Sequence, residues 1–458
     1  MRNLKSWLAA LIPALTAIAG LHGLAAAQTS VTPNSFGFQC GLASGNCPKV
    51  TWPSVQVPPV ARAWDTYIAW GDVMIGWDGT TGTYSWTKVD AWLEQWGAHN
   101  VPAVWYTAGW VPDIPGIAGG DCTQSHHGCS GPPADLTANG SPSFIQFVRD
   151  FLGHCESGGN HYCVADFVKY WGIWNEPSCP HYWGGTQQQL YQLAAPVVSY
   201  IKTNYPNITI SAPEICNCGS YQTWMNAWTA EELSHGILSQ VYAAHVYLGD
   251  RAPESKIAYI TNLTCMNTGK GCTPTAGWAE LPMWITETQY NNTSPYTCVL
   301  GAQDCAGLTA RLQLILQANF GVQGVFWYSY MLSVGDVELS QNDYVAMEGL
   351  LTGGTLPKPC SNSAETWTCD FVEPSGTTAL WVWTTDEGGV SYIIPDGYSQ
   401  YRDLHGNIVP IHAGDPLPIT VEPLMLEQPE NPGSEPNPPS HLRVLSVDLA
   451  SRYATGTK

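Results

Sequence analysis

The chain has 458 residues, enough for one large domain and a smaller one. Its formal charge is −20 with only 12% charged residues, which argues against binding to nucleic acid or to an anionic membrane, because both need clustered Lys and Arg. It contains 21 Trp and 22 Tyr but only 9 Phe, and rings with an apolar face and a polar edge suit carbohydrate as a partner as well as a large aromatic core.

The first residues have the composition of a secretory signal. Arg2 and Lys5 precede an apolar run from Leu8 to Leu24, which is followed by three alanines that are suited to cleavage. No later stretch is long and apolar enough to span a bilayer. We therefore expect residues 1–27 to be removed, and the mature protein to be secreted (extracellular or periplasmic) and not bound to a membrane.

All 15 cysteines follow this segment, and most fall into close pairs. Each pair would close a short loop, and none has the C-x-x-C spacing of a zinc site, so disulfides in an oxidising compartment are expected. The pairs are Cys40/Cys47, Cys122/Cys129, Cys155/Cys163, Cys265/Cys272, Cys298/Cys305 and Cys360/Cys369. Cys179, Cys216 and Cys218 remain, and one bridge from Cys179 to either of the other two would leave one free thiol.

In chain order, buried-looking strands alternate with amphipathic helices. Such alternation predicts a parallel sheet, and eight units predict a closed (β/α)8 TIM barrel over residues 28–352. The expected strands are Phe36–Cys40, Val60–Asp65, Val101–Thr107, Tyr170–Glu176, Asn207–Pro213, Gln240–Leu248, Leu281–Glu287 and Val322–Tyr330. The expected helices are Trp86–Ala98, Pro142–Leu152, Thr186–Thr203, Ser220–Ala230 and Ala306–Phe320, and a disulfide-bonded excursion covers roughly 250–280.

The pattern changes from about Gly353, where helical periodicity disappears. Segments rich in β-formers alternate with Gly-containing turns, which predicts a small antiparallel, β-sandwich-like accessory domain over residues 353–427. Phe36 or its neighbours can add a strand to it. Residues 428–458 are expected to form a proline-rich linker and a tail.

Two of the expected barrel strands end in a glutamate among aromatic residues. Trp174-Asn175-Glu176-Pro177 ends the fourth strand and Trp284-Ile285-Thr286-Glu287 ends the seventh. A carboxylic acid at the mouth of a buried strand costs free energy unless it is used or paired, and basic partners are scarce in this chain. In a TIM barrel both glutamates would lie at the C-terminal face, where active sites are found. Two carboxyl groups facing each other there are the catalytic groups that glycoside hydrolysis needs.

These two motifs resemble those of the retaining glycoside hydrolases of clan A. With Arg62-Ala63-Trp64-Asp65 and Ala244-His245-Val246-Tyr247 added, the pattern is similar to that of glycoside hydrolase family 39 and its relatives, over about residues 36 to 350. The resemblance implies that Glu176 is the acid/base and that Glu287 is the nucleophile. We expect no metal ion and no cofactor.

Four polar residues are expected to assist the glutamates. Asn175 would hydrogen-bond a sugar 2-hydroxyl, or would only form the turn at the strand end. Arg62 would hold Glu287 ionised, or would form a structural ion pair with the nearby aspartate of its own motif. His245 and Tyr247 point to the same side of one strand; Tyr247 would donate to Glu287, and His245 would reach the sugar or the acid, or be a satisfied core histidine.

Three tryptophans are candidate sugar contacts. Trp327, on the eighth strand, would be the platform under the sugar at the cleavage point, or would pack within the barrel. Trp110 would contribute a subsite contact, and Trp183 would line the cleft.

The sequence thus predicts a secreted, monomeric retaining glycoside hydrolase that acts on a plant or microbial polysaccharide or oligosaccharide. Abundant Trp and long loops at the barrel mouth favour endo action. The alternatives are an exo-acting β-glycosidase, such as a β-xylosidase, and a non-catalytic carbohydrate-binding protein.

Overall fold

The computed structural model describes residues 28–39, 59–64, 66–123, 125, 127–249, 252–290, 307–328 and 346–429. The expected signal segment, Asp65, the pairs Cys40/Cys47 and Cys298/Cys305, and the tail from residue 430 lie outside this range. Within it, every helix is too short or too polar to cross a membrane.

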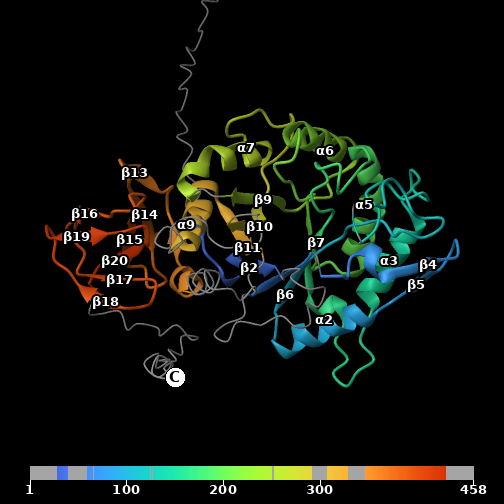
Figure 1. Ribbon diagram of the computed structural model, residues 1–458, viewed down its shortest axis with the longest axis horizontal. Coiled ribbons are helices and arrows are strands. Elements are labelled where there is room, and N and C mark those ends of the chain that lie inside the picture. Colours follow the sequence, from blue (N-terminus) through green and yellow to red (C-terminus); the bar gives the residue numbers. More distant parts are fainter. Residues whose placement is uncertain are drawn as a thin grey trace, which may run out of the picture.

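Eight parallel strands form the barrel sheet, in the order β8-β7-β6-β3-β2-β11-β10-β9 (Figure 1). The parallel bridges Ser211↔Val241 and Ile215↔Ala244 join the two outer strands, so the sheet closes on itself. The predicted TIM barrel is confirmed. Its strands are β2 (Phe36–Gln39), β3 (Val60–Ala63), β6 (Ala103–Thr107), β7 (Val168–Gly172), β8 (Thr209–Ser211), β9 (Tyr242–Gly249), β10 (Met283–Tyr290) and β11 (Val322–Trp327).

Aromatic rings fill the barrel interior beneath its mouth. Trp105 stacks on Tyr170 with ring centroids 5.0 Å apart and lies 5.4 Å from the ring of Trp284. Phe326 completes this group, and small residues such as Ala103 make room for the rings. The packed interior is a rigid floor on which polar groups at the mouth are held.

Within the described parts of the chain, six longer helices cover the outside of the barrel (Figure 1). The five predicted helices are all present, and their starts are fixed locally: Ser141 accepts a hydrogen bond from the Phe144 amide at the start of α3, and Thr186 forms a capping box with Gln189 in α5. The helices are α2 (Thr87–Ala98), α3 (Pro142–Gly153), α5 (Gln187–Asn204), α6 (Tyr221–His235), α7 (Ile257–Thr268) and α9 (Leu308–Phe320). Shorter elements are α1 (Trp70–Val73), α4 (Val164–Phe167) and the hairpin β4 (Met74–Trp77) and β5 (Gly82–Tyr84).

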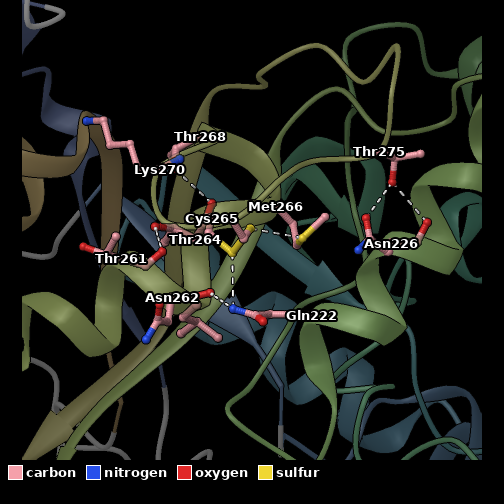
Figure 2. Close-up of a disulfide and its surroundings, with 12 residues drawn as sticks. Gln222, Asn226, Thr261, Asn262, Thr264, Cys265, Met266, Thr268, Lys270 and Thr275 are labelled. Atoms are coloured by element: carbon pink, nitrogen blue, oxygen red, sulfur yellow. Dashed lines mark hydrogen bonds between the residues drawn. A yellow bond between two sulfur atoms is a disulfide. The ribbon is translucent and has the colours of Figure 1, made fainter.

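Helix α7 lies where the sequence indicated only a disulfide-bonded excursion. The helix is rich in Thr and Asn, which have weak helix propensity, so its pattern did not predict it. Tertiary contacts compensate: Figure 2 shows Gln222 of α6 donating to the Asn262 carbonyl oxygen at 3.2 Å and to Cys265 Sγ at 3.3 Å. The Cys265–Cys272 disulfide ties the end of α7 to the following loop.

Every predicted close pair of cysteines within the described residues is bonded. These pairs are Cys122–Cys129, Cys155–Cys163, Cys265–Cys272 and Cys360–Cys369. Cys218 lies within bonding distance of both Cys179 and Cys216, with Cα–Cα separations of 5.2 and 5.4 Å. Because one sulfur forms one disulfide, this trio holds a single bridge and leaves one thiol.

The C-terminal region is antiparallel, as predicted (Figure 1, orange and red). One sheet includes β12 (Thr355–Leu356), β13 (Ser361–Ser363), β14 (Thr366–Val372), β15 (Thr378–Thr384), β20 (Leu424–Glu427), β17 (Gln400–Arg402) and β18 (Ile408–Pro410); β16 (Val390–Ile393) pairs with β19 (Pro416–Ile419). One edge strand of the larger sheet is β1 (Thr29–Ser30), which pairs with β12. The N-terminal segment therefore does add a strand, but Phe36 itself belongs to the barrel.

Candidate active site

Glu176 lies beyond the end of β7, in the backbone that leaves the barrel. The predicted strand to residue 176 is too long, because β7 ends at Gly172. The Glu176 amide donates to the Glu214 carbonyl oxygen at 2.8 Å, and the Glu214 amide donates to the Trp174 carbonyl oxygen at 2.9 Å. Glu176 has a φ of 44°, a left-handed conformation that costs a non-glycine residue free energy. Backbone pairing to the next strand segment thus holds the first glutamate in an unusual conformation.

Glu287 lies within β10, which continues past it to Tyr290. The pairing of β10 with β9 shifts register between Ile285 and Glu287, so that Glu287 stands opposite His245. Such a bulge re-aims a side chain at the rim of a barrel.

The two glutamates meet across the mouth. A carboxylate oxygen of Glu176 and one of Glu287 lie within 4.8 Å of each other, and the residues are only 8% and 3% exposed. Carboxyl groups about 5–5.5 Å apart serve retaining hydrolysis, whereas inverting enzymes need about 6.5–9.5 Å to admit a water. The separation therefore matches the retaining arrangement.

Arg62, at the end of β3, connects four residues of the site. Nη1 donates to Gln39 and to Glu287, while Nη2 donates to Glu214 and, at 2.7 Å, to Asn175 Oδ1. Burial lowers the pKa of the guanidinium, but the charges of Glu214 and Glu287 outweigh burial and raise it. Arg62 thus carries a fixed positive charge beside the second glutamate, and it leaves the Asn175 amide nitrogen as the end available to a sugar hydroxyl.

Glu214, which follows β8, is a third carboxylate of the site and was missed in the sequence. It is fully buried, and its Oε1 accepts hydrogen bonds from Trp105 Nε1 and Thr107 Oγ1, both at 2.7 Å. Burial raises the pKa of Glu214, but the Arg62 guanidinium, followed by His245, outweighs burial and lowers it to about 2. Glu214 is therefore ionised at neutral pH.

The sequence did contain a signal for Glu214. It directly follows the predicted strand Asn207–Pro213, just as Glu176 follows its own strand. The signal was weaker because Glu214 has no neighbouring aromatic residues in the chain; its aromatic partner Trp105 comes from another strand.

His245, in β9, stands among the three carboxylates. Its Nδ1 lies 2.7 Å from Glu176 Oε1 and 3.4 Å from Glu287 Oε2, and its Nε2 lies 3.6 Å from Glu214 Oε2. Burial lowers the pKa of His245, but the charge of Glu287 and the contacts with Glu176 and Glu214 together raise it to about 9. At neutral pH His245 is an imidazolium that donates to Glu176, so it is more than a histidine satisfied in the core.

Tyr247 extends from the same side of β9. Its hydroxyl donates to Glu287 Oε2. Burial, reinforced by the charges of Glu287 and Glu176, raises the pKa of Tyr247 well above its usual value, so the phenol keeps its proton. Glu287 thus receives hydrogen bonds on both oxygens, from Arg62 and from Tyr247.

Trp110 belongs to an aromatic cluster beside the mouth. It has a φ of 53° and stacks with Trp64 at a centroid separation of 6.4 Å, and its ring lies 5.4 Å from that of Tyr182. Trp64 in turn lies 5.9 Å from the Arg62 guanidinium carbon. The cluster connects the expected subsite residue to the polar site through Trp64.

The other two tryptophans lie in packed surroundings. Trp183 is 2% exposed, meets Trp174 edge to face at 5.1 Å and donates from Nε1 to the Thr186 carbonyl oxygen at 3.1 Å. Trp327 ends β11 in register with Thr288 of β10, and it is buried in the main hydrophobic core. The expected sugar contacts of both residues stay predictions.

Three sets of described residues have the spacing of a metal site. Two of them include disulfide-bonded cysteines, which are not free to bind a metal, and the third lies at the barrel mouth. Glu176, His245 and Glu287 each offer one ligand atom, and these atoms lie within 4.8 Å of one another. The imidazolium of His245 and the donors Arg62 and Tyr247 already direct positive charge or protons at these oxygens, so a cation would have to displace them. The surroundings suit proton transfer better than metal binding.

Comparison with known proteins identifies the architecture. No protein-family model matches the chain, and no curated protein matches it. Among solved structures, a family 39 glycoside hydrolase from Bacteroides cellulosilyticus aligns with a TM-score of 0.56 at 16% identity, over 87% of this chain and 81% of that one. The catalytic domain of family 30 xylanase C from Talaromyces cellulolyticus aligns with a TM-score of 0.52 at 14% identity, over 88% and 98%.

A third solved structure, a family 51 α-L-arabinofuranosidase from Bifidobacterium longum, aligns with a TM-score of 0.52 at 11% identity, over 88% of this chain and 97% of that one. All three alignments cover most of both chains. Sequence identities this low show a shared fold and no more. The chain therefore has the fold of the TIM-barrel glycoside hydrolases of clan A.

Proposed function

We propose that this protein is a retaining glycoside hydrolase that cleaves O-glycosidic bonds of a plant or microbial polysaccharide or oligosaccharide by double displacement. The observation that carries the proposal is the approach of Glu176 and Glu287 to within 4.8 Å across the barrel mouth. The shared fold with glycoside hydrolases supports it.

In the first step Glu287 attacks the anomeric carbon. A C–O bond forms to its carboxylate, the glycosidic C–O bond breaks, and Glu176 gives its proton to the departing oxygen. Arg62 and Tyr247 keep Glu287 ionised and aimed, because both donate to it. The Asn175 amide, oriented by Arg62, would donate to the 2-hydroxyl of the sugar.

In the second step Glu176 changes role. It takes a proton from water, whose oxygen attacks the anomeric carbon and releases Glu287 as a carboxylate. His245 hydrogen-bonds Glu176 at 2.7 Å, so the two residues share the proton that leaves in the first step and returns from water in the second. Two displacements at one carbon restore the original anomeric configuration.

Endo action is the finer part of the proposal. The connection between β6 and α3, residues 108–141, contributes Trp110 and a disulfide-bonded loop beside the mouth. A long loop that places a tryptophan beside the mouth suits several sugar units bound in a row. The bonded cysteine pairs support the proposal that the protein works outside the cytoplasm.

The proposal is tested by hydrolysis of a panel of defined oligosaccharides. Glu176→Gln and Glu287→Gln are each expected to lower kcat/KM at least about 100-fold, since each removes a reacting carboxyl. Glu156→Gln is the matched control, because Glu156 is a buried glutamate that bonds the Tyr162 amide away from the mouth. Full activity in both site variants would refute the assignment.

The two roles are separated by azide. With Glu287→Ala, azide enters from the face that the nucleophile leaves open, and an inverted glycosyl azide is expected. With Glu176→Ala, azide replaces water in the second step and gives a retained product. Proton NMR of the first-formed sugar in the native enzyme should show retention, and inversion would rule out double displacement.

The mode of cleavage is read from the products. Endo action predicts products of mixed length and a rapid fall in the viscosity of a polysaccharide solution. Release of single sugars from one end, with viscosity unchanged at early times, would instead favour an exo-acting β-glycosidase.

A further inference from the structure

Among the described residues, Glu214 is the most enclosed carboxylate at the barrel mouth. It lies deeper than the two reacting glutamates, with no exposed side-chain surface. Three side chains from two strands donate to it: Arg62 from β3, and Trp105 and Thr107 from β6. Gly172 makes room for it, because a Cβ at that position would stand 2.5 Å from Glu214 Oε1. The surrounding strands are thus built around this carboxylate.

The Glu214 backbone is part of the same arrangement. Its amide and carbonyl groups pair with the segment Trp174–Glu176, which carries the acid/base. Its side chain reaches back across the mouth to the guanidinium that holds Glu287. One residue therefore contacts the supports of both reacting glutamates, although it is too deeply buried to touch a sugar.

We propose that Glu214 is a positioning residue of this site, which holds Arg62 against Glu287 and Asn175 and stabilises the imidazolium form of His245. The proposal rests on the proposed glycosidase function. In this proposal Glu214 is a third carboxylate of the site, which acts neither as acid/base nor as nucleophile.

The first effect is geometric. A guanidinium with two free ends rotates, but Arg62 is fixed because Nη2 bonds Glu214 and Asn175 while Nη1 bonds Glu287. Loss of the Glu214 charge leaves the buried Arg62 with Glu287 as its remaining ionic partner, and Nη2 is then free to move. The Asn175 amide would lose its fixed orientation as a consequence.

The second effect is electrostatic. In the described structure the charged groups that face His245 are Glu176, Glu214 and Glu287, and Tyr247 of its own strand faces it as a neutral phenol. The 3.6 Å contact between His245 Nε2 and Glu214 is too long for a good hydrogen bond, so it acts through charge. The proton shared by His245 and Glu176 is the one that the leaving group needs, and Glu214 helps to retain it at alkaline pH.

The pH profile of kcat/KM tests this effect. In Glu214→Gln the alkaline limb is expected to move to lower pH by about 1 unit, because one of three counter-charges within about 4 Å of the imidazolium is gone. kcat at the optimum is expected to fall about 10-fold as Arg62 shifts. Glu214→Asp keeps the charge with a shorter side chain, so its alkaline limb should stay in place while kcat falls.

Glu232→Gln is the matched control. Glu232 is also fully enclosed, but it lies in α6 and bonds Ser239, away from the mouth. Its substitution should leave the alkaline limb in place. The proposal is overturned if Glu214→Gln has the wild-type profile, or if Glu214→Asp shifts the limb as far as Glu214→Gln.

A readout without substrate separates this proposal from the proposed function. NMR titration of the His245 ring, assigned by loss of its signal in His245→Gln, is expected to show a midpoint near 9 in the native protein. The midpoint should fall by about 1 unit in Glu214→Gln. A midpoint near 6.5 in the wild type would overturn the proposed role of Glu214 even if hydrolysis is found. Because this measurement needs only the wild-type protein, it tests the proposal even if Glu214→Gln does not fold. Absence of hydrolysis with the expected titration would refute the glycosidase function alone.

Discussion

At the scale of single residues, the barrel mouth contains more negative than positive charge. Among the residues that the structure describes there, three buried carboxylates face one guanidinium and one imidazolium. Burial of an unpaired carboxylate costs several kcal/mol, so each charge depends on its neighbours. Removal of one charged side chain is therefore expected to change the pKa values and the positions of the others.

Tyr247 offers a test of a single hydrogen bond. Tyr247→Phe removes the donor to Glu287 Oε2 and keeps the ring, so Glu287 loses one of its two fixed partners. We expect kcat to fall about 100-fold with a much smaller change in KM, since the bond aligns a reacting group. Tyr242→Phe on the same strand is the control, because its hydroxyl bonds the Leu263 carbonyl oxygen on the outer side of the barrel. Equal kcat values in Tyr247→Phe and wild type would contradict the aligning role.

Gly172 offers a test of space. In Gly172→Ala the new methyl group would stand 2.5 Å from Glu214 Oε1 and 2.9 Å from Thr107 Oγ1. Because both atoms are fixed in a buried network, we expect a loss of about 1–3 kcal/mol in the free energy of unfolding, together with lower kcat. Gly153→Ala at the end of α3 has open space around its Cβ and is the control. Chemical denaturation of both variants measures the difference.

At the scale of elements, α6 carries a buried carboxylate away from the mouth. Glu232 accepts hydrogen bonds from the Ser239 amide at 3.0 Å, the Ser239 hydroxyl at 2.7 Å and the Leu238 amide at 3.3 Å. Burial raises the pKa of Glu232 to about 7, against the hydrogen bonds from Ser239 and Leu238, which lower it. The carboxyl is thus neutral in acid and must ionise in a buried position as the pH rises.

The raised pKa of Glu232 predicts that Glu232→Gln stabilises the protein at high pH but not at low pH. A group whose folded pKa lies above its unfolded value contributes stability below the unfolded pKa, and that contribution is lost as the pH rises through the folded pKa. The wild type should therefore lose up to about 3 kcal/mol between pH 4.5 and pH 8, and Glu232→Gln should not. We expect the Tm of the variant to exceed that of the wild type by several degrees at pH 8 and to match it closely at pH 5. A constant difference at both pH values would contradict this.

At the scale of the whole molecule, the barrel and the C-terminal sheet share structure. The N-terminal strand β1 completes the C-terminal sheet, and one hydrophobic cluster contains residues of both parts, among them Val325 and Phe371. Trp383 of β15 donates from Nε1 to Glu254 Oε1, beside α9, at 2.7 Å. Glu254 is also 3.6 Å from Arg311 Nε.

Shared structure predicts cooperative unfolding. Thermal unfolding of the native chain should show one transition, because separation of the parts exposes a common core. Trp383→Phe should lower the free energy of unfolding by about 1–3 kcal/mol, since it leaves the Glu254 side chain, which is only 6% exposed, short of a donor. Calorimetry measures both, and two resolved transitions would show that the parts unfold independently.

The sequence alone determined the barrel, its strands and the identity of the two mouth glutamates. Those features depend on local order: runs of apolar residues, helical spacing, and a carboxylate where a strand stops. The motifs around Arg62, His245 and Tyr247 also placed these side chains on strands whose ends meet. The structure then supplied the contacts that the motifs led us to expect between Arg62, Tyr247 and Glu287.

Only the tertiary structure decided the contacts of Glu214, the extent of α7 and the surroundings of Trp183. Glu214 has no unusual neighbours in the chain, and its partners Arg62, Trp105 and His245 are far from it in sequence. Helix α7 forms against its propensity because α6 packs on it. A buried charge or a weak helix is stabilised by groups from other segments of the chain. Local patterns predict the strands and helices, but they do not encode which side chains from distant segments come into contact when the barrel closes.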